Sequence, residues 1–235
     1  MHEGVTHRVI VKRVASARRF TLRVRAADCE AVLTMPPSAS LKAAQAFVER
    51  NAAWVGTRLA ALPGRIPLLP GTVVPLRGVD HRIAIDPAAL RRVRPAAGAD
   101  GAALLGVSPR VPDPAAAVLH FLMGEARRDL AAAVARHAAT LGKPVARITL
   151  RDTRSRWGSC SSRGALNFSW RLILAPPSVL DYLAAHEVAH LVHMDHSEAF
   201  WRVTRSLAPA MDEAERWLKV EGPGLHRYGL PANTR

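Results

Sequence analysis

Residues 186–196 of the chain read HEVAHLVHMDH, in which three histidines and one glutamate follow a spacing typical of a metal site. On an α-helix, side chains four residues apart project from one face about one turn from each other. His186 and His190 can therefore present two imidazoles to one metal ion, and Glu187 can reach a water molecule on that ion without being a ligand itself. The stretch predicts a helix that carries one catalytic zinc ion.

A third ligand has to come from outside this pair, because a hydrolytic zinc site keeps three protein ligands and leaves one position to water. His196 matches the last histidine of the extended H-E-x-x-H-x-x-G-x-x-H pattern, in which the chain leaves the helix and turns back under the metal. His193 stands where that pattern has glycine. Histidine tolerates a positive φ better than most residues, so we expect a turn that differs in detail.

Several alternatives accompany this interpretation. H-E-x-x-H also occurs by chance, and a helix with two histidines can simply be solvated. His193 could replace His196 as a ligand, line the pocket or be a solvated turn residue. Asp195 either orients a ligand imidazole or is an ordinary turn aspartate.

The sequence around the motif favours helices on both sides of its last histidine. Residues 178–192 form the predicted metal-binding helix, and Ser178 with Asp181 resembles a capping box. Ser197 is a good N-cap for the next helix, and residues 211–220 form a last one.

Alternating apolar residues before the motif predict short strands. Residues 145–150, 156–160 and 165–172 have this pattern, and residues 161–164 read as a turn. We expect a small antiparallel hairpin beside the metal helix. An edge strand at such a site can receive a peptide by main-chain pairing, and the sequence does not show which strand lies at the edge.

Beyond the H-E-x-x-H run, the chain resembles the YgjP-like and SprT-like zinc metallopeptidase domains, and the YgjP branch in particular. The resemblance covers most of the chain and rests on Arg156-Trp157-Gly158-Ser159-Cys160, Leu166-Asn167, Arg171-Leu172, Ala175-Pro176, Asp181-Tyr182, His196-Ser197 and Phe200-Trp201. It implies that His186, His190 and His196 bind zinc and that Glu187 is catalytic. Members of this family are mostly described as metallopeptidases, and nucleotide hydrolysis has also been attributed to them.

The expected fold class is α+β, with an N-terminal β-rich region that includes a helix and a zincin-like C-terminal domain whose small antiparallel sheet packs on the H-E-x-x-H helix. We expect domains over residues 1–110 and 111–235, because the proline-spaced residues 109–114 resist regular structure. In the N-terminal region, the expected elements are strands over residues 1–36, a helix over 40–62, a strand pair over 73–76 and 81–85, and a loop or short helix over 87–101.

A long helix should begin at Pro114 and end near Leu141-Gly142, with glycine at the position where helices commonly terminate.

The chain is strongly basic, with 33 Lys and Arg against 19 Asp and Glu and a formal charge of +14. Residues 1–112 hold 17 of the basic and 7 of the acidic side chains. We expect a basic β-hairpin whose two strands contain Lys12-Arg13 and residues 21–25, with Arg18-Arg19 between them. Thr21, Arg23 and Arg25 share one of its faces, a plausible surface for nucleic acid or a nucleotide. Because only four of the 33 are lysine, a general composition bias towards arginine is the competing explanation.

Composition sets further limits. No apolar run approaches the roughly 18 residues that a membrane-spanning helix needs, and the first residues do not resemble a signal peptide, so we expect a cytoplasmic protein without a membrane partner. Cys29 and Cys160 do not form a disulfide framework, and each is expected to be a small buried strand residue, with a functional role as the alternative for Cys160, which lies near the motif. The oligomeric state is not indicated.

The expected reaction is hydrolysis of a peptide or protein, in which zinc activates a water and Glu187 accepts its proton. Two rivals stay open: a metal-dependent nucleoside triphosphate pyrophosphatase, and a nucleic-acid-associated protein with a structural zinc. Candidates for contacts with the substrate or the developing oxyanion are Arg156, Trp157, Asn167, Arg171, Tyr182 and His193.

Overall fold

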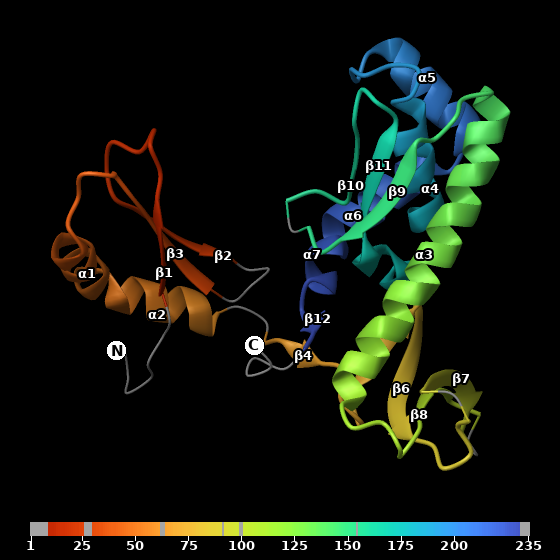
Figure 1. Ribbon diagram of the computed structural model, residues 1–235, viewed down its shortest axis with the longest axis horizontal. Helices are drawn as coiled ribbons and strands as arrows, with labels where there is room; N and C mark the ends of the chain where they lie inside the picture. The colour runs from red at the N-terminus through yellow and green to blue at the C-terminus, as the bar shows by residue number, and fades with distance from the viewer. Residues whose placement is uncertain are drawn as a thin grey trace. The chain divides into compact units, whose positions relative to one another are not determined.

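The computed structural model describes residues 9–25, 30–61, 64–90, 92–98, 101–153 and 155–230. The chain forms two compact units, residues 1–65 and 66–235, which Figure 1 colours red to orange and orange to blue. Cys29 lies outside the described residues.

The smaller unit contains a three-stranded sheet of β1 (Val9–Arg13), β2 (Thr21–Arg25) and β3 (Glu30–Met35) in the order β1-β3-β2. Strand β1 runs parallel to β3, and β2 runs antiparallel to it. The predicted hairpin between the first two strands is therefore wrong. Strand β3 is the most apolar of the three and most of its side chains are buried, so it occupies the centre of the sheet, where neighbours cover it from both sides.

Two helices follow this sheet in place of the single predicted helix. Ser40 caps α1 (Leu41–Arg50) by accepting a hydrogen bond of 3.1 Å from the amide of Ala43, and α2 (Ala52–Ala60) begins after a break at Asn51. The core of this unit contains Leu33, Met35 and Ala44, and it includes the stacked rings of Phe20 and Phe47 at 5.2 Å.

The larger unit begins with a four-stranded sheet. Its strands are β5 (Val73–Leu76), β6 (Val79–Ile85), β7 (Val93–Ala97) and β8 (Ala103–Val107), in the order β5-β6-β8-β7. The antiparallel pairing of β5 with β6 confirms the predicted strand pair. The expectation of a loop or short helix over residues 87–101 is wrong, because β7 pairs with β8 along the whole length of both strands.

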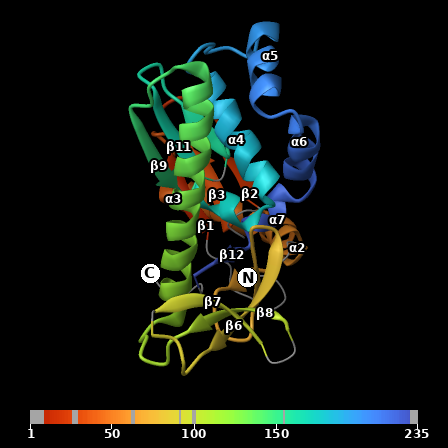
Figure 2. The ribbon, with the colours of Figure 1, turned by 90° about the vertical axis from the view of Figure 1, so that its right-hand side faces the viewer.

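The long helix α3 (Pro114–Leu141) is confirmed, with Asp113 capping its start and Gly142 at φ 60° ending it. One hydrophobic core contains Ile83 and Leu105 of the sheet together with Leu122 and Leu130 of α3. The boundary expected near residue 110 therefore does not fall between the two compact units, since the strands before it share a core with the helix after it. Figure 2 shows α3 running from this sheet to the helix α4 (Pro177–Ala189), which carries the H-E-x-x-H motif.

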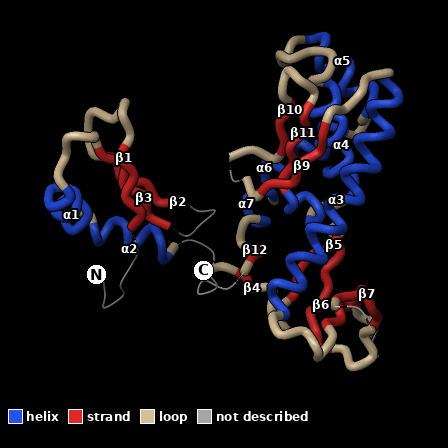
Figure 3. Tube along the Cα trace, in the orientation of Figure 1, coloured by secondary structure: helices blue, strands red, loops and turns tan. Residues whose placement is uncertain are grey.

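A second sheet lies at the other end of α3, as the red segments of Figure 3 show. Its strands are β9 (Arg147–Arg151), β10 (Gly158–Cys160) and β11 (Ala165–Ser169), in the order β10-β11-β9. The antiparallel pair β10 and β11 confirms the predicted hairpin, whereas β9 runs parallel to β11, so the sheet as a whole is mixed. The last predicted strand ends early, because residues 170–174 form a 3-10 helix, η1 (Trp170–Leu174).

The motif helix is α4 (Pro177–Ala189), followed by α5 (Glu198–Leu207), α6 (Met211–Val220) and α7 (Gly222–Leu225). Ser197 caps α5 as predicted. The predicted capping box on α4 is wrong: Pro176 is the N-cap residue without a side-chain bond, and the carboxylate of Asp181 instead contacts Arg136 and His137 of α3. The chain ends its described part in β12 (Tyr228–Gly229), which pairs with β4 (Ile66–Pro67).

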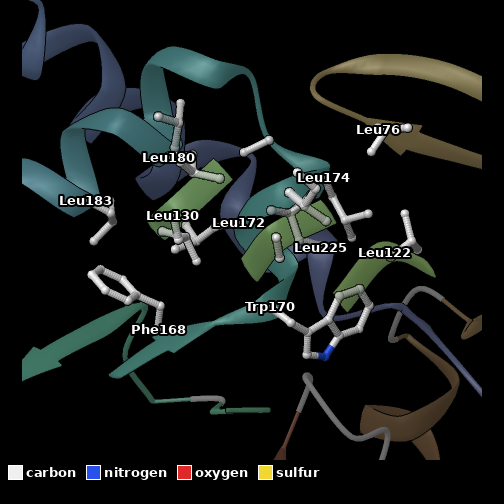
Figure 4. Packing of buried hydrophobic residues seen from close by; sticks show 14 of the residues in the cluster. Leu76, Leu122, Leu130, Phe168, Trp170, Leu172, Leu174, Leu180, Leu183 and Leu225 are labelled. Atoms are coloured by element: carbon white, nitrogen blue, oxygen red, sulfur yellow. The ribbon is translucent and has the colours of Figure 1, made fainter. Parts of the chain in front are cut away.

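The larger core gathers around α3, α4 and η1, and Figure 4 shows its leucines packed with Phe168 and Trp170. On α4, Ala184, Ala185 and Val188 are completely buried. This burial is what holds the motif helix in place, since its own residues carry little amphipathic pattern. Within the described ranges, no helix combines the length and the apolar character that crossing a membrane would require.

Candidate metal centre

The three histidines of the motif converge. His186 lies in the last turn of α4, His190 is its C-terminal cap residue, and His196 belongs to the loop before α5. One ring nitrogen of each lies within 4.8 Å of the other two, and Nε2 of His196 is 3.3 Å from Nε2 of His186. Three imidazole nitrogens at this spacing can bind a single metal ion.

The orientation of His190 is set by the turn that follows the helix. Its Nδ1 lies 2.9 Å from the carbonyl oxygen of His193. A carbonyl only accepts hydrogen bonds, so Nδ1 carries the proton and Nε2 is left for a metal. His193 thus contributes its backbone, and its side chain is not among the converging ligand atoms of the described residues.

The turn itself needs no left-handed residue. Among the described non-glycine residues, only Arg77 has a positive φ, so His193 takes the glycine position of the extended motif without that conformation. Asp195 accepts a hydrogen bond of 3.3 Å from the amide of Ser197, as a turn aspartate does.

Two aromatic residues of α5 pack against the imidazoles. Phe200 is fully buried and stacks on His190 at 4.4 Å, and Trp201 stacks on His196 at 5.6 Å. Because Ser197 caps α5, the start of this helix also fixes where His196 stands. The rings therefore have few alternative positions.

Glu187 is buried beside the histidines, with 4% of its surface exposed. Its Oε2 atom is buried and has no hydrogen-bond partner among the described residues. Burial raises the pKa of this carboxyl to about 7, against an opposing effect of the Arg156 cation. Burying a carboxylate oxygen without a hydrogen bond costs free energy in a closed core. The position of this oxygen therefore fits a site where a water molecule or a ligand supplies the missing hydrogen bond.

Strand β10 packs directly against the carboxylate of Glu187 at Gly158. A methyl group at Gly158 would lie 2.8 Å from both Cγ and Cδ of Glu187 and would clash with its Oε1. Only glycine allows this approach between strand and helix. The contact is a feature that the sequence did not reveal, although Gly158 lies in the middle of the RWGSC run.

His186 has electrostatics that suit a metal ligand. Burial, together with the neighbouring His190 and His196, lowers its pKa to about 4. The imidazole is therefore neutral near pH 7, which is the form that binds a metal. Together with the unpartnered oxygen of Glu187, this donor set fits a zinc ion with one open position.

Three further residues were predicted to contact the substrate or the developing oxyanion, namely Arg156, Asn167 and Arg171. Arg156 lies close enough to Glu187 to affect its pKa, and Asn167 donates to Ser159 on the adjacent strand at 3.4 Å. Arg171 is buried, with its guanidinium 4.4 Å from the ring centre of Trp170 and 3.3 Å from the carboxylate of Asp152.

Tyr182 lies one turn before His186 on α4, 5% exposed, with its ring edge-on to that imidazole at 5.9 Å. Burial raises its pKa to about 12, so the phenol keeps its proton and can donate one hydrogen bond.

Trp157 occupies a place that the sequence did not indicate. Its ring stacks on His226 at 4.9 Å and touches the position of a Cβ on Gly222 at 3.0 Å. The C-terminal segment therefore supports the residue that precedes Gly158. No pattern in the sequence links residues 157 and 226, which are far apart along the chain.

Comparison with known proteins agrees with the motif. The family model of the YgjP-like metallopeptidase domain matches residues 18–221. Among solved structures, the metallopeptidase zymogen abylysin of Pyrococcus abyssi is similar, with 16% identity, coverage of 43% of this chain and 99% of the abylysin chain, and a TM-score of 0.34, a likeness too partial to inform the site. A search of curated proteins gave no match. The chain belongs to the YgjP-like metallopeptidase family.

Proposed function

We propose that the chain is a zinc-dependent peptidase that binds one ion through His186, His190 and His196 and uses Glu187 as general base. The observation that carries the proposal is the convergence of three imidazole nitrogens within 4.8 Å beside a buried carboxylate whose Oε2 has no partner among the described residues. Zinc bound there would lower the pKa of a water molecule and polarise the substrate carbonyl.

The chain's own groups then perform the proton transfers. Glu187 accepts a proton from the attacking water and returns it to the leaving amine. A carboxyl with a pKa raised to about 7 is suited to both steps near neutral pH, because it gains and loses a proton at similar free energy.

Strand β10 is the place where we expect the substrate. In its sheet β10 pairs only with β11, so its other edge has no partner strand among the described residues. The same strand touches Glu187 through Gly158. An extended peptide paired with this edge would lie beside the catalytic carboxylate, held by main-chain bonds that require little side-chain specificity.

The test is the Glu187→Gln substitution in protein verified by metal analysis to hold one zinc per chain. We expect cleavage of a peptide library to fall by about 10²–10⁴-fold while zinc content stays unchanged, since the general base is lost and the ligands are not. The matched control is Glu213→Gln, which removes an exposed carboxylate of α6 and should leave the rate unchanged.

The same preparation tests both rivals. Release of phosphate from nucleoside triphosphates without peptide cleavage would replace the peptidase proposal with nucleotide hydrolysis. Zinc-loaded protein that binds nucleic acid and cleaves neither substrate would instead indicate a structural zinc.

A further inference from the structure

The smaller unit carries a concentrated positive charge. Residues 1–65 contain eleven Lys and Arg but only four Asp and Glu, a formal charge of +7. Residues 66–235 have the same net charge over a chain more than twice as long. The net positive charge per residue is therefore higher in the smaller unit, which contains the three-stranded sheet, than in the larger unit.

The strand register places cations from both outer strands on one face of that sheet. Lys12 of β1 lies opposite Thr34 of β3, which in turn lies opposite Thr21 of β2. Arg23 is two residues along from Thr21 and therefore projects to the same side. Val32, which is buried opposite Arg23, and Glu30 at the start of β3 project to this side too. We call the surface formed by Lys12, Thr21, Arg23 and Thr34 the basic face.

The opposite face is the apolar one. Leu33, Met35 and Leu22 project there and form the core with α1. Arg13 also projects to that side, and its guanidinium donates to the carbonyls of Pro37 and Ala39 at 2.6 and 2.8 Å. Arg13 therefore stabilises the loop after β3 through these hydrogen bonds and is not counted with the cations of the basic face.

Lys12 and Arg23 are exposed and form no ion pair among the described residues. Two more exposed cations, Arg18 and Arg19, lie in the turn that leads from β1 to β2. In the larger unit some arginines are paired, as Arg136 is with Asp181 at 2.8 Å, and others, such as Arg82 and Arg163, are also exposed without an ion pair among the described residues. A bias towards arginine in composition explains the number of cations, but not the alignment of Lys12 and Arg23 on one face, where Glu30 is the one acidic residue among those of the three strands.

We propose that the basic face binds the phosphate backbone of a nucleic acid without reading its sequence. Lysine, arginine and threonine side chains are common donors to phosphate oxygens. None of the three strands contains an aromatic residue, and Phe20 is stacked on Phe47 in the core, so the face offers no platform for stacking bases. The inference does not depend on the proposed peptidase activity.

The experiment measures binding of the full chain to a fluorescent 20-base-pair DNA duplex over a range of salt concentrations. The double variant Lys12→Gln/Arg23→Gln should bind about tenfold or more weakly in low salt and reduce the slope of log K against log salt by about 2, since two phosphates would no longer be neutralised by the protein. Each single variant should reduce the slope by about 1.

The matched control is Lys42→Gln/Arg58→Gln, which removes one lysine and one arginine, both exposed, from α1 and α2. We expect its affinity to change less than threefold. Equal weakening by both double variants would assign binding to diffuse net charge and overturn the proposal. Failure of the native chain to bind the duplex, or equal affinity for polyglutamate, would overturn it as well.

Discussion

At the scale of single residues, the site depends on two groups in contact, Gly158 and Glu187. The missing side chain of Gly158 allows β10 to lie against the carboxylate, which is thereby both buried and fixed in position. Burial raises the pKa of the carboxyl, so the same contact sets the geometry and the chemistry of the proposed base.

Substitution Gly158→Ala should separate positioning of the base from metal binding. The new methyl group would force Glu187 or β10 to move, and we expect peptidase activity to fall at least 100-fold with one zinc retained. Gly124→Ala is the control, because a Cβ at Gly124 in α3 meets nothing within 4 Å and alanine favours a helix. Activity of Gly158→Ala equal to that of Gly124→Ala would refute this role.

The buried carboxyl of Glu187 should make metal-free protein less stable as the pH rises. Its pKa is raised from 4.5 to about 7, so the folded state holds this proton more tightly than the unfolded chain does. The stabilisation is complete below pH 4.5 and is lost as the pH rises through about 7.

Urea unfolding of metal-free native protein and Glu187→Gln at pH 5 and pH 8 measures this effect. The Gln variant should gain stability relative to the native chain by about 2 kcal/mol between these pH values. His186, with its pKa lowered to about 4, has the opposite slope in both proteins and cancels from the difference. A difference independent of pH would contradict the buried position of the carboxyl.

At the scale of elements, the site is supported by segments distant in sequence. Helix α3 is tied to α4 where Asp181 accepts from His137 at 2.9 Å, a bond that lowers the pKa of Asp181. The segment after α7 is anchored by the pairing of β12 with β4, and it places His226 against Trp157. Helix α4 and strand β10 are thus each supported from outside the motif.

Removal of the His226 ring should loosen β10. For His226→Ala we expect faster amide hydrogen exchange at Gly158–Cys160 and about a tenfold lower kcat with unchanged zinc content, because aromatic pairs contribute about 0.5–1.5 kcal/mol. His226→Phe keeps a ring and should restore most of the protection. The control His120→Ala removes an exposed ring from α3. Unchanged exchange in His226→Ala would exclude this support.

At the scale of the whole molecule, all three proposed ligands lie in the unit of residues 66–235, whose core is continuous through α3, α4 and the four-stranded sheet. Metal binding is therefore expected to stabilise that unit as a whole. Residues 1–65 have a small core of their own and should not respond to the ion.

Calorimetry with zinc and with a chelator tests this expectation. At a free zinc concentration of about 100 Kd, binding adds roughly 2.7 kcal/mol, which raises Tm by about 5–10 °C for a domain of this size. The shift should appear in the larger unit, persist in Glu187→Gln and disappear in His196→Ala. A full shift in His196→Ala would remove that residue from the ligand set.

Much of the larger unit could be predicted because its signals are local. Asp113, Pro114 and Gly142 define the ends of α3 within a few residues of the chain. The turn at residues 161–164 likewise produces the hairpin of β10 and β11. By contrast, Val93 is the one buried residue of β7, so the apolar pattern that would indicate a strand beside β8 is weak in its sequence.

The sequence by itself determined the helix that carries His186 and Glu187, although this helix ends at its cap residue His190 and not at the predicted residue 192. It also indicated His196 through the length of the following turn. Only the tertiary structure decided that β3 separates the first two strands, that the four-stranded sheet joins the core of α3, and that Gly158 closes on Glu187. These arrangements depend on which buried surfaces pack together, and those surfaces come from segments far apart in the chain. The spacing of residues within one segment does not show which other segment it will contact.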